Sequence, residues 1–328
     1  MLHRPANSNS AQPLPEPRAE ISPAVIASHP ARFCLSRNAL FVTVVALALL
    51  IFWMPLSIIL GHPIWTDNAY DKYCYTVIVP FLSLILVFLD RRVIFSSVRY
   101  CFGAGTILFA VSIFLRLFAG QIQSRIGVDN SLIIEILGLV VFWIGGFILC
   151  FGTSAFRAGA FPLLLLLLTV PVPGFLLNEL IVAVQHGSAD VCSFIFGLFR
   201  VPVLKNGLVF SLPDVSIEVE KVCSGIHSTM ATLLVSIIIA HLFITRGWKK
   251  VLLILAAVPI VCVTNGFRIA LLTLLAQYVD RSFLYGRLHH QGGVLFFALA
   301  LLLLYLVLRL LRIGDPKRGA VSSSQETV

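Results

Sequence analysis

Long apolar runs, separated by short polar stretches, constrain this chain more than any other feature of its sequence. A helix needs about 20 mostly apolar residues to cross a hydrocarbon core of about 30 Å. Hydrophobic residues make up 59% of the chain and charged residues only 12%, against about 25% charged residues in a typical soluble domain. The sequence therefore predicts an all-α polytopic membrane protein with about eight transmembrane helices, at about residues 39–60, 73–89, 100–119, 132–151, 161–172, 225–244, 251–278 and 292–311.

The basic residues predict the orientation of these helices. An even number of crossings places both termini on the same side of the membrane. With the termini inside, fifteen of the 24 Lys and Arg residues lie on the cytoplasmic side and eight outside, as the positive-inside rule requires. The net charge of +9 is therefore a topology signal with some affinity for membrane lipid, and we expect no nucleic-acid partner. The expected organisation is a disordered cytoplasmic tail (1–38), a transmembrane domain (39–312) and a second cytoplasmic tail (313–328).

One ion pair is left open by the sequence. Arg116 and Glu135 fall near the outward ends of the third and fourth expected spans. They either pair with each other, or each side chain reaches the membrane interface alone.

The segment between the fifth and sixth spans is the largest expected outside the membrane. The fifth span ends at two prolines, Pro171 and Pro173, which should stop a helix. Residues Leu176–Leu198 have helical spacing with polar interruptions, which predicts an amphipathic helix lying on or dipping into the outer leaflet. Apolar and polar residues then alternate over Val215–Val219 behind a Pro213-Asp214 turn, so a short β-hairpin should lead into the sixth span.

Cys223 follows this hairpin, at the start of the sixth span. Unpaired N–H groups and the helix dipole favour a thiolate in the first turn of a helix. Considered alone, Cys223 is more simply explained as a packing residue, because free cysteines are usually buried. The seven cysteines contain no CxxC pair, which argues against a zinc ribbon or a disulfide framework.

Two further polar groups are expected at the same membrane face. Arg268 lies about 26 Å along a helix that starts at Val251, close to the outer edge of the membrane core. Asn265 is three residues earlier and shares its helix face. The pair His289-His290 precedes the eighth span. A thiolate, a cation that stabilises an oxyanion and an acid/base are the groups that a cysteine acyltransferase or protease requires.

At this point the sequence resembles the exosortase/archaeosortase family of membrane transpeptidases. The resemblance covers roughly residues 73–312 and rests on Phe161-Pro162, Pro171-Val172-Pro173, Gln185, Arg200-Val201-Pro202-Val203, Val219, Cys223-Ser224-Gly225-Ile226, Asn265-Gly266-Phe267-Arg268-Ile269, His289, Gly293 and Phe296-Phe297. It implies that Cys223 is the nucleophile, that Arg268 stabilises the thiolate or the transition state, and that His289 is the acid/base. Asn265, Ser224 and Gly225, next to these residues, are expected to bind the substrate.

The resemblance also implies the substrate and the location. The substrate would be the C-terminal sorting signal of an exported protein, made of a Pro-Glu-Pro motif, a transmembrane helix and a basic end. The cleaved protein would pass to an acceptor in the envelope or exopolysaccharide. The expected location is the cell inner membrane, with an extracytoplasmic active site and no cofactor or metal.

Three alternatives stay open. His227 stands where the family often has arginine and shares a helix face with Cys223, so it competes for the acid/base role, as does His290. The chain could instead be a non-enzymatic, transporter-like protein with an outward-facing Arg/His site. A metal site formed by Cys223, His227, His289 and His290 is disfavoured, because acidic partners for the ligands are scarce.

Overall fold

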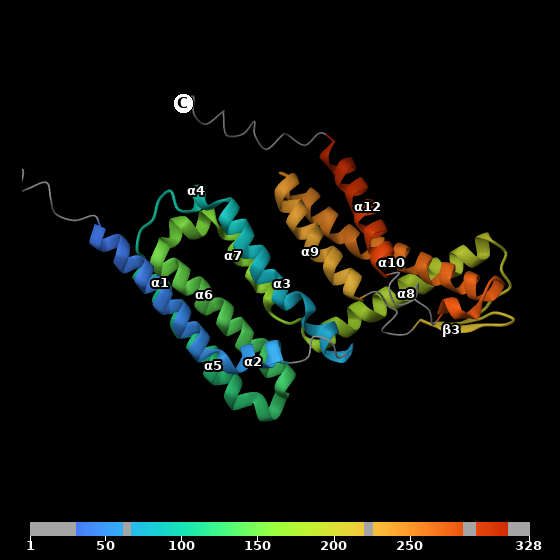
Figure 1. Cartoon of the computed structure of the whole chain (residues 1–328), viewed down its shortest axis with the longest axis horizontal. Coiled ribbons are helices and arrows are strands. Elements are labelled where there is room, and N and C mark those ends of the chain that lie inside the picture. Colours follow the sequence, from blue (N-terminus) through green and yellow to red (C-terminus); the bar gives the residue numbers. More distant parts are fainter. Residues whose placement is uncertain (1–30, 62–66, 220–225, 285–292, 314–328) are drawn as a thin grey trace, which may run out of the picture.

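The computed structural model describes residues 31–61, 67–219, 226–284 and 293–313; for residues 31–38, 60, 61, 67–75 and 284 it describes the backbone alone. These residues form helices and a small antiparallel sheet, arranged as two groups along the longest axis of the molecule (Figure 1). The first group comes from the N-terminal half of the chain and the second from the C-terminal half.

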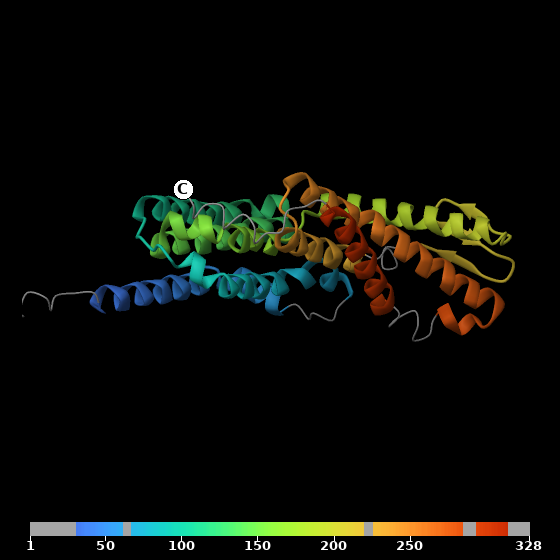
Figure 2. The ribbon, with the colours of Figure 1, turned by 90° about the horizontal axis from the view of Figure 1, so that it is seen from above.

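The N-terminal group is organised around a long helical hairpin, α5–α6. The two helices approach closely because Gly105 and Gly145 have no side chains between them, and the Ser112 hydroxyl of α5 donates to the Gly138 carbonyl of α6 at 2.7 Å. Figure 2 shows α1 and α3 in a second layer against this hairpin. The elements are α1 (Ala31–Ile51), α2 (Trp53–Gly61), α3 (Asp67–Leu89), α4 (Arg91–Ile94), α5 (Phe102–Ile126), α6 (Val128–Ala158), α7 (Ala160–Leu165) and the 3₁₀ helix η2 (Leu166–Thr169).

The C-terminal group is organised around α10, which packs against α8, α9 and α12. Its contact with the N-terminal group includes the ring of Phe161 in α7 stacked on His241 in α9, with centroids 3.5 Å apart. The elements are α8 (Gly174–Leu198), β1 (Leu204–Asn206), β2 (Val209–Ser211), β3 (Ser216–Glu218), α9 (Ile226–Phe243), α10 (Gly247–Tyr278), η4 (Arg281–Leu284) and α12 (Gly293–Arg312).

The predicted β-hairpin is confirmed. Strands β2 and β3 pair antiparallel, with Val209 opposite Glu218 and Ser211 opposite Ser216. Along the second strand, Val215 and Val219 are buried whereas Ser216 and Glu218 are exposed, as the alternation indicated. Strand β1, which was not predicted, adds a third antiparallel strand beside β2.

The structure supports a multi-pass membrane protein, but it divides the chain differently from the expected eight spans. Within the described residues six helices are long and apolar enough to cross a membrane: α5, α6, α8, α9, α10 and α12. A seventh crossing is formed if α1 and α2, bent by 69° at their junction, count as one span. The second and fifth expected spans correspond to shorter apolar helices, Thr76–Leu89 and Ala160–Thr169.

The placement of α8 and the start of α1 differ from expectation. Helix α8 was expected to lie on the outer leaflet, yet by length and apolarity it qualifies as a spanning helix. Its polar residues Gln185 and Ser188 are buried against other elements, so they do not mark a water-facing side. Helix α1 begins at Ala31, within the segment expected to be a disordered tail.

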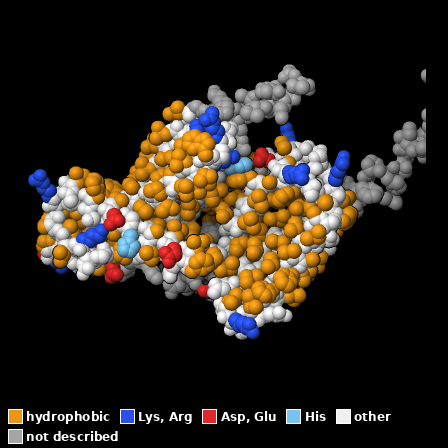
Figure 3. Space-filling view, turned by 180° about the vertical axis from the view of Figure 1, so that it is seen from behind, with side chains coloured by type: hydrophobic (Ala, Val, Ile, Leu, Met, Phe, Trp, Pro, Cys, Tyr) orange, Lys and Arg blue, Asp and Glu red, His pale blue; other side chains and the backbone are white. Residues whose placement is uncertain are grey.

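Basic residues from different helices meet at one end of the molecule. The Lys249 ammonium, at the start of α10, donates to the carbonyls of Leu311 (2.6 Å) and Ile313 (3.1 Å) at the end of α12. The Arg312 guanidinium lies 5.7 Å from the ring centroid of Phe243, the last residue of α9. Figure 3 shows hydrophobic side chains over the middle of the molecule and most Lys and Arg side chains at its margins. This arrangement agrees with the charge asymmetry behind the N-in, C-in prediction, which stays a prediction.

The Arg116–Glu135 question is answered by the structure. Arg116 Nη1 lies 3.2 Å from Glu135 Oε1, joining α5 to α6. The two charges therefore pair with each other, which lowers the cost of placing them in an apolar helical hairpin.

Candidate active site

The predicted site residues are only partly described by the structure. Arg268 and Asn265 lie in α10, and the competing His227 is the second residue of α9. Cys223, Ser224, Gly225, His289 and His290 lie outside the described residues. The structure therefore shows Arg268, Asn265 and the elements that flank the other residues in the chain.

Arg268 lies on the inner side of α10. One face of this helix is exposed at intervals of four residues, at Val251 (56%), Leu255 (64%), Val263 (47%) and Phe267 (44%). Arg268 belongs to a different stripe, between buried Thr264 one turn before it and buried Leu272 one turn after it. Its side chain therefore leaves the helix backbone on the side that faces the rest of the protein. This position argues against an arginine that merely extends from the lipid face to the interface.

Asn265 connects α10 to α8. Its amide nitrogen donates to the Ser188 hydroxyl at 3.0 Å, and both side chains are buried. The helix backbones are close here because Gly266 has no side chain: a Cβ at that position would lie 2.7 Å from the Ser188 carbonyl oxygen. Small residues and side-chain hydrogen bonds are typical of helix contacts in membranes. The observed role of Asn265 is thus to position helices, and its expected contact with substrate stays a prediction.

Gln185, one turn before Ser188 on α8, holds the end of the sheet. Its amide nitrogen donates to the backbone carbonyl of Val219 at 2.8 Å, and the Gln185 side chain is buried. Val219 also donates its backbone N–H to Leu208 and packs in a cluster that includes Ala270 of α10. The chain segment that leads to Cys223 is therefore anchored beside α10, two residues along that helix from Arg268.

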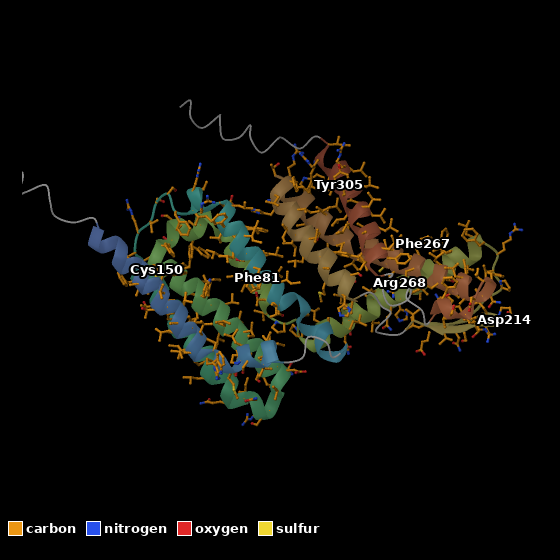
Figure 4. The ribbon with its side chains drawn as sticks, in the orientation of Figure 1. Phe81, Cys150, Asp214, Phe267, Arg268 and Tyr305 are labelled. Carbon is orange, nitrogen blue, oxygen red and sulfur yellow. The ribbon has the colours of Figure 1, made fainter. Side chains whose placement is uncertain are left out.

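Two polar contacts fix the remainder of the sheet on the same helices. The Lys205 ammonium of β1 forms an ion pair with Asp190 of α8 at 2.8 Å. The Asp214 carboxylate in the β2–β3 turn accepts a hydrogen bond from the Gln277 amide of α10 at 2.7 Å. Figure 4 shows Asp214 at the far end of the sheet and Arg268 nearer the centre of the molecule. The sheet thus extends away from the Arg268 region and is fastened at both ends.

The start of α12 contacts α10 one residue before Arg268. Phe296, the fourth residue of α12, meets Phe267 edge to face, with ring centroids 6.2 Å apart. Phe267 is adjacent to Arg268 in the chain (Figure 4). The end of the sheet and the beginning of α12 therefore both contact α10 within a few residues of Arg268.

Sequence reasoning missed the roles of Gln185 and Ser188. Gln185 was noted as a polar interruption of an amphipathic helix and as part of the family resemblance, and Ser188 was not singled out. A usable signal was present, because a polar side chain inside an apolar helix must find a hydrogen-bond partner when it is buried. Hydropathy does not reveal that Gln185 holds Val219, which lies four residues before the candidate nucleophile Cys223.

The described residues contain no group of three or more His, Cys, Asp and Glu side chains that could hold a metal ion. Three of the four residues considered for a metal site lie outside the described ranges, so that alternative is not tested by this observation. Chemically, the described part of the site contains the guanidinium of Arg268, a group with several donors that suits a thiolate, a carboxylate or a developing oxyanion.

A family of membrane proteins matches most of the sequence. The sequence model described as transmembrane exosortase (Exosortase_EpsH) matches residues 65–306, which include the sheet, α8, α9, α10 and most of α12. Neither the curated proteins nor the solved structures yielded a match. Because the family match extends over well more than half of the sequence, the chain belongs to the transmembrane exosortase family.

Proposed function

We propose that this protein is a membrane-embedded cysteine peptidase or transpeptidase that cleaves the C-terminal sorting signal of exported proteins. The signal would consist of a Pro-Glu-Pro motif, a transmembrane helix and a basic end, and the product would be transferred to an acceptor in the envelope or exopolysaccharide. Cys223 is the nucleophile, Arg268 the stabilising cation and His289 the acid/base. The enzyme acts in the cell inner membrane, with its site on the extracytoplasmic side.

The position of Arg268 carries this proposal. Arg268 is a half-buried residue of α10; two residues after it, Ala270 belongs to the same apolar cluster as Val219 at the end of the sheet, and one residue before it, Phe267 contacts Phe296 at the start of α12. Cys223 follows Val219 by four residues, and His289 precedes Gly293 by four residues. Four residues of extended chain cover at most about 14 Å. Covalent connectivity therefore limits how far Cys223 can lie from Val219 and how far His289 can lie from Gly293, and both anchoring residues belong to elements that pack near Arg268 on α10.

A guanidinium close to Cys223 would serve two steps of the reaction. Before attack, its charge favours the thiolate over the thiol. During attack on the scissile carbonyl, its N–H donors stabilise the oxyanion that develops. His289 would then protonate the leaving amine as the acyl-enzyme forms. Attack by the acceptor releases the exported protein from Cys223.

The face of α10 next to Arg268 is suited to the hydrophobic part of a sorting signal. An apolar groove of about 430 Å³ lies between α10 and α12 and includes Phe267, Leu271 and Phe296 among its lining residues. Phe267 and Leu299 also line an adjoining groove of about 480 Å³ toward α8. A transmembrane segment lying there would present its end at the level of Arg268.

The test is the processing of a tagged exported substrate by substituted enzymes. Cys223→Ala should abolish processing while the protein remains inserted and abundant, and Cys223→Ser should be nearly inactive. Cys101→Ala, Cys150→Ala, Cys192→Ala and Cys262→Ala are matched controls that should retain processing. Normal processing by Cys223→Ala at normal expression would disprove covalent catalysis through this residue.

Arg268 substitutions distinguish a charge effect from a geometric one. Loss of one oxyanion donor typically lowers the rate by about 10² to 10³. Lysine keeps the charge but cannot reproduce the planar arrangement of donors, so Arg268→Lys should be nearly as inactive as Arg268→Ala. Alkylation of Cys223 should slow more in Arg268→Ala than in Arg268→Lys. Near-normal processing by Arg268→Lys would show that the positive charge alone suffices.

A further inference from the structure

A crevice separate from the Arg268 region lies between α1, α3 and α6. Its volume is about 470 Å³, and its lining includes Phe41 of α1, Phe81 of α3 and Trp143 of α6. Among the described residues that line it, Ser83, Arg91 and the indole N–H of Trp143 supply the polar groups. Ser83 donates its hydroxyl to the Pro162 carbonyl at 2.6 Å, so the crevice is apolar along its length and charged at the Arg91 end.

The crevice opens toward the lipid and is about one leaflet long. Phe81 and Phe88, on its outer side, are exposed by 63% and 61%, and Figure 4 shows Phe81 on α3. The α3 residues in its lining run from Pro80 to Leu84 and Phe88, ahead of Arg91. Eleven residues of helix extend about 16 Å, which matches half of a hydrocarbon core of about 30 Å.

One end of the crevice carries a positive charge. The Arg91 guanidinium lies 4.1 Å from the centroid of the Phe88 ring and donates to the Phe88 carbonyl at 2.8 Å. Arg92 follows it in the single turn of α4, and Asp90 precedes it in the chain. This segment therefore carries two positive charges and one negative charge.

The volume of the crevice suits a lipid chain. At about 470 Å³ it falls within the range of pockets that hold small ligands, about 300–1,000 Å³. An unbranched acyl chain is narrow enough to lie along α3.

We infer that this crevice binds an anionic phospholipid, with one acyl chain lying along α3 between Phe81 and Trp143 and the phosphate contacting Arg91 and Arg92. Guanidinium groups pair well with phosphate oxygens. A basic group at the membrane surface strengthens binding of an anionic lipid by roughly fivefold for each Lys or Arg. The site is independent of the proposed peptidase activity.

Trp143 makes the inference measurable. The chain has four tryptophans, so a variant with Trp53→Phe, Trp65→Phe and Trp248→Phe retains Trp143 as its sole tryptophan. The full-length variant is reconstituted into phosphatidylcholine vesicles that contain increasing amounts of phosphatidylglycerol or phosphatidylcholine brominated on the acyl chain. Brominated phosphatidylglycerol should quench Trp143 fluorescence at a mole fraction at least tenfold lower than brominated phosphatidylcholine. A second variant that retains Trp248 alone reports on lipids around α10 and should show less discrimination.

Substitution of the arginines tests the headgroup contact. Combined Arg91→Gln and Arg92→Gln changes should remove the preference for phosphatidylglycerol at Trp143. The matched control, Arg309→Gln with Arg312→Gln, removes the same charge from α12 and should leave the preference intact. In the protein with all its arginines, higher salt should also reduce the preference, since a partly exposed charge contact is screened.

Three results would overturn the inference. Equal quenching of Trp143 by the two lipids would mean that the crevice does not select anionic headgroups. Absence of quenching by either lipid would show that no acyl chain reaches Trp143 and that another occupant fills the crevice. A preference that persists in the Arg91→Gln, Arg92→Gln protein and at high salt would exclude the arginines as the headgroup site.

Discussion

The hydrogen bond from Gln185 to Val219 gives a direct test of how the fold positions the candidate nucleophile. Gln185→Met retains an unbranched side chain of similar length but removes the donor. The change leaves the Val219 carbonyl, which accepts from Gln185 at 2.8 Å, without that bond in a buried setting. An unsatisfied buried acceptor costs about 1–3 kcal/mol. If the segment before Cys223 shifts so that the Val219 carbonyl finds another donor, Cys223 is displaced. This free-energy cost then raises the activation barrier of the reaction.

The expected magnitude follows from this range. Each 1.36 kcal/mol in an activation barrier changes the rate tenfold, so a cost of about 1–3 kcal/mol corresponds to a roughly 5- to 150-fold lower kcat for substrate processing. Because Gln185 reaches the sheet and not the groove beside Phe267, KM should change little. We expect the rate of Cys223 alkylation by a small thiol reagent to change as well, which a loss of substrate binding would not produce.

The assay compares Gln185→Met with His186→Leu, a change at the next residue of α8. His186 is exposed, so its replacement should leave kcat and the alkylation rate unchanged. The measurements are processing kinetics in detergent or vesicles, the alkylation rate, and the thermal unfolding midpoint at equal expression. Wild-type kcat in Gln185→Met, together with an unchanged alkylation rate, would refute the idea that this bond positions Cys223.

Two further predictions follow from the helix contacts and the charge distribution. Gly266→Ala should lower stability by about 1–3 kcal/mol, as overpacking does, because its Cβ would lie 2.7 Å from the Ser188 carbonyl oxygen. The control is Gly197→Ala on α8, where a Cβ meets nothing within 4 Å. Equal thermal midpoints for the two variants would contradict the close α8–α10 contact. Reporter fusions at Asn206 should be active outside the cytoplasm and those after Lys250 inside it, since the basic residues concentrate at the opposite end; a cytoplasmic Asn206 would place the proposed site in the wrong compartment.

The family resemblance and the local elements were accessible from the sequence. Hydropathy indicated a polytopic helical protein, and the alternation around Val215 and Val219 predicted the hairpin that the register of β2 and β3 confirms. These features depend on residues that are close together in the chain and on the regular spacing of apolar residues, so they can be detected from the sequence alone. The pattern Asn265-Gly266-Phe267-Arg268 also indicated a site in α10, and the match to the exosortase family over residues 65–306 confirms the resemblance.

The packing of the site came only from the tertiary structure. Helix α8 was expected on or dipping into the outer leaflet because polar residues such as Gln185 interrupt its apolar pattern, whereas Gln185 and Ser188 are buried and hydrogen-bonded to Val219 and Asn265. The pairing of Arg116 with Glu135 was likewise open until α5 and α6 were placed together.

The physical reason is the solvent. In a bilayer, apolar side chains gain little by contacting each other rather than lipid, so hydropathy identifies helices but not their neighbours. Neighbours are selected by close backbone approach at small residues and by hydrogen bonds between buried polar groups. Gly266, Asn265 and Gln185 are such residues, and each acts through a partner that is 34 to 78 residues away in the chain. The sequence alone thus determined which segments are helices and which residue types the site contains, and the three-dimensional packing decided which of them meet.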